Sequence, residues 1–113
     1  MLLLISGVSI KILQVNFKFT IPRAELEKAF LHVAPRFGPK GDVKGLLWKM
    51  WLVNESENSF SGIYLFKDES SLEAYLQGEI FAELKTKPIV SDVEAKVFDI
   101  MLEPTKITRG PVE

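Results

Sequence analysis

The chain has 113 residues, 47% hydrophobic and 26% charged, as is typical of a single globular domain. Its formal net charge is -1, and it lacks the basic excess of a nucleic-acid-binding surface, so we expect no nucleic-acid partner. The absence of cysteine excludes disulfides, thiol catalysis and Cys-ligated metals and fits a cytoplasmic protein, while a single histidine, His32, excludes a multi-histidine metal site.

The first residues are apolar but lack a basic segment before them and a clear cleavage site after them. The apolar run is also too short to span a bilayer, so we expect no membrane association. We interpret residues 1–9 as an N-terminal extension.

Residues 11–19 alternate with a period of two and predict a strand with two different faces. One face carries Leu13, Val15, Phe17 and Phe19, and the other carries Ile12, Gln14, Asn16 and Lys18. Thr20 is a plausible N-cap for the element that follows, with Pro22 in its first turn.

A helical period begins at residue 23 and predicts a helix to about residue 34, with an apolar stripe at Leu26, Ala29, Phe30 and Val33. Pro35 ends it, and residues 35–45 are a loop by composition. Residues 46–54 and 61–66 predict two strands joined by the polar turn 55–59, which is short enough to force an antiparallel hairpin.

A second helix is expected after residue 67, capped by Asp68 or by Ser70, which has capping-box spacing to Glu73. Gly78 weakens this helix or breaks it. Residues 90–100 predict the fourth strand. The buried stripe of the helix is Leu72, Tyr75, Leu76, Ile80 and Leu84.

The order β-α-β-β-α-β predicts an α+β protein: a ferredoxin-like sandwich with a four-stranded antiparallel sheet and two helices on one face. We expect this domain to span residues 10–102, with residues 103–113 as a C-terminal tail. The other sheet face is also apolar, since Trp48 and Trp51 are three residues apart and fall on opposite faces. A patch of this kind needs a cover, and a second copy of the chain is the simplest one.

Several segments together resemble the YdhR-like monooxygenases: Gly45–Trp51, Gly62–Phe66, Ala74–Leu76, Ser91–Asp99 and Thr108–Pro111. The resemblance runs from Ile10 onward. It implies a dimeric α+β barrel within the antibiotic-biosynthesis monooxygenase superfamily. Members of that superfamily oxidise aromatic or polyphenolic substrates with molecular oxygen, often without metal or flavin, so no cofactor is expected.

Haem-degrading relatives use an Asn on the first strand, a Trp on the third and a His on the second helix. Asn16 suits the first place, but the third strand carries Tyr64 and the second helix has no histidine. The resemblance therefore does not imply haem degradation.

Five residues are candidates for the wall and polar groups of a pocket: Asn16, His32, Trp48, Trp51 and Tyr64. Each has a structural alternative: His32 as an exposed helix residue, the tryptophans and Tyr64 as core, and Asn16 as a paired amide. Lys49 is expected to pair with Glu94 or with an acid of the other subunit. No catalytic residue is assigned, because no catalytic triad, phosphate loop or carboxylate pair is present.

The expected function is cofactor-independent oxidation of a small aromatic or quinol-like molecule by a homodimer. Such chemistry demands little of the protein beyond orienting the substrate and taking a proton. The alternatives are a non-catalytic small-molecule-binding or stress-response dimer on the same fold, and a dimer whose helix–sheet gap is filled by side chains.

Overall fold

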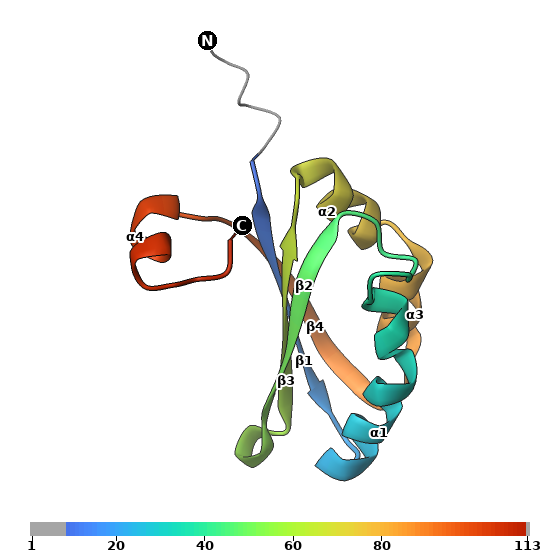
Figure 1. Ribbon diagram of the computed structural model, residues 1–113. Coiled ribbons are helices and arrows are strands. Elements are labelled where there is room, and N and C mark those ends of the chain that lie inside the picture. The colour runs from blue at the N-terminus through green and yellow to red at the C-terminus, as the bar shows by residue number, and fades with distance from the viewer. Residues whose placement is uncertain (1–8, 113) are drawn as a thin grey trace.

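The computed structural model describes residues 9–112, and the N-terminal extension predicted for residues 1–9 lies almost entirely outside them. The described chain forms one sheet with helices on both of its sides (Figure 1). The strands are β1 (Lys11–Phe19), β2 (Leu46–Asn54), β3 (Ser59–Phe66) and β4 (Val90–Asp99). The helices are α1 (Arg23–Val33), α2 (Glu69–Leu76), α3 (Glu79–Thr86) and α4 (Leu102–Ile107), with short 3₁₀ helices at Ala34–Phe37 and Glu55–Glu57.

The four strands lie in the order β2-β3-β1-β4, and every neighbouring pair is antiparallel. Helices α1, α2 and α3 cover one face of this sheet, which we call the inner face (Figure 1). The predicted ferredoxin-like α+β fold is therefore confirmed. β2 and β4 are the edge strands.

The core lies between the inner face and these helices. Every second residue of β1 is buried there, from Leu13 to Phe19, as its alternation predicts. Leu26 of α1 and Leu72 and Tyr75 of α2 supply the helical side of the core.

The helix boundaries correct one prediction and resolve two others. Thr20 is not an N-cap: α1 is capped by Pro22, and no side chain accepts a hydrogen bond from its first turn. At α2 the cap is Asp68, whose carboxylate accepts a bond of 2.9 Å from the Ser71 backbone N–H, and not Ser70. Gly78 breaks the second helix, because α2 ends before it and it is the N-cap of α3.

Residues after β4 turn back along the outer face of the sheet, opposite the three covering helices (Figure 1). This C-terminal arm, residues 100–112, contains α4, and its end is tied to β2 by a hydrogen bond of 2.8 Å from Trp48 Nε1 to the Pro111 carbonyl. Sequence periodicity predicts a plain tail here and misses the short helix. The arm provides part of the cover that the outer face needs.

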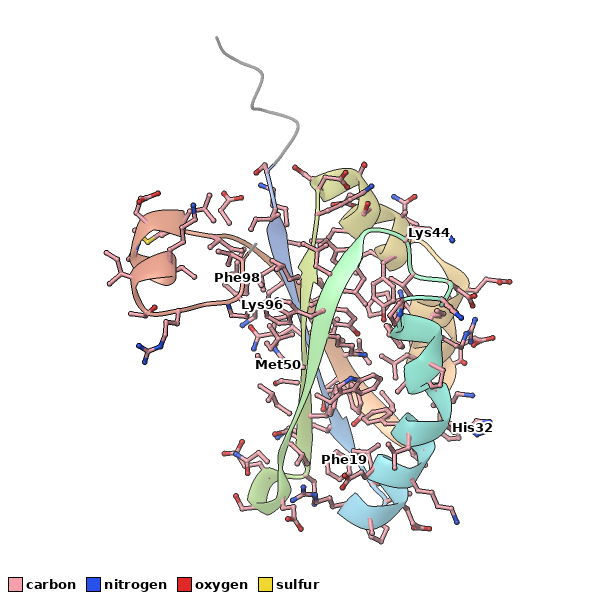
Figure 2. All side chains as sticks on the ribbon, viewed as in Figure 1. Phe19, His32, Lys44, Met50, Lys96 and Phe98 are labelled. Carbon is pink, nitrogen blue, oxygen red and sulfur yellow. The ribbon has the colours of Figure 1, made fainter. Side chains whose placement is uncertain are left out.

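Within the described residues, the rest of the outer face stays open. Met50 and Leu52 of β2 and Phe98 of β4 are each close to half exposed. Figure 2 shows Met50 and Phe98 on the side of the sheet away from α1.

Candidate functional site

An apolar cavity of about 300 Å³ lies between the inner face of the sheet and helices α1, α2 and α3. Its volume is roughly twice the ~150 Å³ of an apolar protein cavity that accepts benzene. The gap between helices and sheet is thus not filled by side chains, contrary to the third alternative. Most lining residues are apolar or aromatic, among them Val15, Phe30, Phe37, Trp51, Phe60 and Tyr64.

Strand alternation aims these side chains into the cavity. Lys49 lies opposite Tyr64 in the β2–β3 register, and Trp51 lies opposite Gly62. Since side chains two residues apart share a face, Lys49 and Trp51 project together toward the helices. Trp48 projects to the outer face, so the prediction that the two tryptophans lie on opposite faces is confirmed.

The aromatic wall is continuous across elements. Trp51 packs against Phe30 of α1 with ring centroids 4.9 Å apart, and against Phe37 at 5.4 Å in an edge arrangement. Phe30 in turn contacts Phe60 of β3 at 4.7 Å. Such pairs contribute about 0.5–1.5 kcal/mol each beyond area burial. The wall is therefore a rigid apolar surface that suits a planar ring.

Two tyrosine hydroxyls form the buried polar group of this cavity. Tyr64 Oη of β3 and Tyr75 Oη of α2 are 3.0 Å apart and hydrogen-bonded. Burial raises the pKa of both phenols, so both remain protonated near neutral pH. One hydroxyl donates to the other, which leaves one O–H proton of the pair to donate elsewhere, for example to a ligand oxygen.

Lys49 lines the cavity among aromatic rings, and the sequence interpretation misplaced it. Its Nζ lies 3.5 Å from the Trp51 ring centroid, 3.8 Å from that of Phe37 and 4.5 Å from that of Tyr64. Burial lowers the pKa of Lys49 from 10.5 to about 7. The sequence does indicate this position, because Lys49 and Trp51 lie two residues apart in an alternating strand and therefore share a face.

The predicted pairing of Lys49 with Glu94 is wrong. Glu94 lies on β4 opposite Asn16, on the outer face, and its carboxylate contacts Asn16 Nδ2 at 3.4 Å and Lys96 Nζ at 3.8 Å. The sheet separates the two groups. Asn16 Oδ1 also accepts a bond of 2.6 Å from Ser61 Oγ, so this amide is satisfied on the outer face.

Of the five predicted pocket residues, the structure brings Trp51 and Tyr64 together in the cavity wall. Asn16 and Trp48 lie on the outer face, where Trp48 bonds the C-terminal arm. His32 is exposed on α1 and points away from the sheet in Figure 2.

A second hollow of about 250 Å³ opens between α1 and the edge strand β2. It shares four wall residues with the cavity: Leu26, Phe30, Trp51 and Phe60. The contacting rings of Phe30 and Trp51 therefore belong to both hollows and form a partition between them.

The described chain offers neither a metal site nor a membrane-spanning helix. Between residues 9 and 112, no three His, Asp or Glu side chains gather closely enough to hold a metal ion. In the same range, every helix is too short or too polar to cross a lipid bilayer.

Comparison with known protein families gives one match that spans most of the chain. The model of the family described as "Putative mono-oxygenase ydhR" matches residues 12–111. No curated protein sequence matches the chain.

Solved structures share the fold at low sequence identity. SnoaB of Streptomyces nogalater, described as a cofactor-independent oxygenase, has a TM-score of 0.63 and 19% identity, covering 81% of this chain and 93% of its own. NE2512 of Nitrosomonas europaea, of unknown function, has a TM-score of 0.65 and 17% identity, covering 84% and 92%. MhuD of Mycobacterium tuberculosis, a heme-degrader with two hemes bound in its active site, has a TM-score of 0.59 and 19% identity, covering 81% and 97%.

Proposed function

Because the chain belongs to the ydhR mono-oxygenase family, we propose that it oxidises a small aromatic or quinol-like compound with molecular oxygen and without a bound cofactor. The observation that carries the proposal is the aromatic-walled cavity, which has room for a ring and contains few polar groups. The description of SnoaB as a cofactor-independent oxygenase on the same fold supports it.

The reaction class follows from what such a cavity offers. A phenol or an activated methylene compound reacts with oxygen once it has lost a proton, because its anion supplies the electrons. In the methylene case, CH₂ and O₂ become C=O and H₂O, so the substrate provides all four electrons that reduce O₂ and no redox cofactor is required. The protein has to hold the ring, exclude water and receive a proton.

In this scheme the aromatic wall orients the substrate ring. The hydroxyl pair of Tyr64 and Tyr75 acts as a hydrogen-bond donor to the substrate oxygen, since both phenols stay protonated. Neither tyrosine serves as the base near neutral pH.

Oxygen uptake by the purified protein tests the proposal, with hydroquinones and anthrone-type compounds as substrates. Ala29→Phe, at the α1 wall of the cavity, is expected to reduce the uptake at least about tenfold by filling the substrate space. Ala24→Phe, which is exposed on the same helix and absent from the cavity wall, is the matched control and should keep the wild-type rate.

Absence of uptake above background across the panel would contradict the oxygenase. If an aromatic ligand still binds the wild type and is excluded by Ala29→Phe, the non-catalytic small-molecule-binding or stress-response module is the better description.

The proposal includes a homodimer that joins the two outer faces. Met50, Leu52 and Phe98 leave an apolar patch beside the C-terminal arm, and burying it against a second copy removes it from water. In sedimentation velocity at micromolar concentration, the wild type is expected as a dimer and Met50→Asp as a monomer. Leu31→Asp, which removes a more exposed apolar side chain from α1, should remain dimeric. A monomeric wild type would refute the assembly.

A further inference from the structure

Lys49 carries an amine into an apolar cavity, and no carboxylate of the described residues contacts it. Its side chain is largely buried, and its Nζ lies against the faces of Trp51 and Phe37. In the described part of the chain, no Asp or Glu lies within ion-pair distance of this nitrogen. Ring faces stabilise a desolvated cation, but by less than the hydration it loses.

Gly62 gives the lysine its position. A side chain at Gly62 would place its Cβ 3.1 Å from the Tyr64 ring and 3.3 Å from Lys49 Cε. Glycine therefore leaves open the space that the end of the lysine chain occupies. A larger residue on β3 would displace the ammonium from the rings.

The other charges around the cavity favour an anion in it. Arg36 of the 3₁₀ helix after α1, Glu83 of α3 and Lys87 after α3 line it together with Lys49. Arg36 pairs with Glu83 at 3.6 Å and with Asp42, outside the lining, at 3.1 Å, so among the described residues Lys49 and Lys87 are the lining cations that have no carboxylate partner. The remaining titratable groups in the lining, Tyr64 and Tyr75, are neutral donors.

We propose that Lys49 binds the ionised oxygen of the ligand, so that the cavity selects acidic phenols and enols and holds them as anions with the ring against Trp51 and Phe37. The neutral amine of Lys49 takes the proton of the ligand hydroxyl: the O–H bond breaks, an N–H bond forms, and an ammonium–oxyanion pair results. The free O–H of the tyrosine pair donates to the same oxygen. This deepens the proposed function, since the oxygen-reactive form of the substrate is the anion.

The pairing also explains how a lone lysine is tolerated in the cavity. Without ligand, burial disfavours the ammonium and the pKa of Lys49 falls to about 7. With an oxyanion beside it, the charge regains a partner, so the ammonium becomes the stable form again. Ligand binding and proton transfer are thereby coupled at a single nitrogen.

Binding of 4-nitrophenol tests this assignment without turnover, because only the ionised probe absorbs strongly in the visible range. Excess wild-type protein should lower the ionisation midpoint of the probe by at least about one pH unit, a tenfold preference for the anion. Lys49→Met should abolish the shift and weaken binding of the anion at least about tenfold. Lys28→Met, an exposed lysine on α1 outside the cavity wall, is the matched control and should retain the shift.

A neutral probe separates loss of the anion site from loss of the cavity. 4-Nitroanisole has the same ring but no ionisable group, and we expect it to bind Lys49→Met at least as well as the wild type. Failure of the wild type to bind 4-nitrophenol, or an unchanged midpoint in Lys49→Met, would overturn the assignment.

Oxygen uptake then separates the two proposals. Anion binding that depends on Lys49 but comes with no oxygen uptake supports the Lys49 assignment and contradicts the oxygenase. Uptake that persists in Lys49→Met supports the oxygenase and contradicts the role of Lys49 in it.

Discussion

Lys49 places a titratable amine among aromatic rings, and replacing it with methionine should change how the stability of the protein depends on pH. Methionine keeps the length of an unbranched chain and removes the charge, so it suits the same space. The perturbation therefore isolates the cost of holding an ammonium in the cavity.

The magnitude follows from the pKa. A fall from 10.5 to about 7 corresponds to about 5 kcal/mol at ~1.36 kcal/mol per unit. We therefore expect a cost of about 5 kcal/mol for the protonated lysine in the folded protein.

The sign follows from proton counting. Between about pH 7 and 10.5 the unfolded chain binds a proton at Lys49 that the native protein releases, so the free energy of unfolding rises with pH. The penalty is fully present below pH 7 and absent above 10.5. Lys49→Met lacks this dependence. It should be more stable than the wild type by about 5 kcal/mol near pH 6, and the difference should narrow toward zero near pH 10.5.

Urea unfolding followed by tryptophan fluorescence measures the difference across this pH range. One protein concentration must be used throughout, because the stability of a dimer depends on it. Lys28→Met, an exposed lysine on α1, serves as control and should follow the wild-type curve within about 0.5 kcal/mol. A difference between Lys49→Met and the wild type that is constant with pH, or a variant that is less stable near pH 6, would refute the reasoning.

Three further predictions concern other groups. Asp68→Ala should lower the melting temperature measured by circular dichroism, because it removes the cap of α2. Ser70→Ala should leave the melting temperature unchanged. Because hydrogen bonds from Ser71 lower the pKa of Asp68, the difference in melting temperature between Asp68→Ala and the wild type should disappear in acid, below the ordinary pKa of 3.8. Phe30→Ala should lower the free energy of unfolding, measured in urea, by about 3 kcal/mol. It should also join the two hollows, so that naphthols gain affinity relative to phenols. An unchanged ratio of the two affinities would contradict the role of Phe30 as a partition. Tyr75→Phe should cost about 1–3 kcal/mol by leaving the Tyr64 hydroxyl unpaired, and the double variant with Tyr64→Phe should cost less than the sum of the single ones.

The secondary structure and its order can be predicted from the chain because both depend on local periodicity. The alternation of Leu13 to Phe19 assigns the faces of β1, and the breaking residues Pro35 and Gly78 end helices where they stand. The same local rules fail at Thr20, whose side chain caps nothing, because α1 begins two residues later than a cap at that position requires.

The candidate site could be anticipated only in part. Trp51 and Tyr64 were predicted as wall residues, and both line the cavity. Alternation also shows that Lys49 shares a face with Trp51. It does not show which face of the sheet the helices cover, or whether a carboxylate lies near Lys49 on that face.

Residue spacing alone was enough to specify the four strands, the helical segments that cover the inner face and their ferredoxin-like arrangement. Only the tertiary structure decided that Lys49 meets three aromatic rings and, among the described residues, no acid, that Tyr64 meets Tyr75, and that the C-terminal arm returns to Trp48. The physical reason is distance along the chain: periodicity relates residues within one element, whereas the burial, partners and pKa of a side chain depend on elements that fold against it from elsewhere.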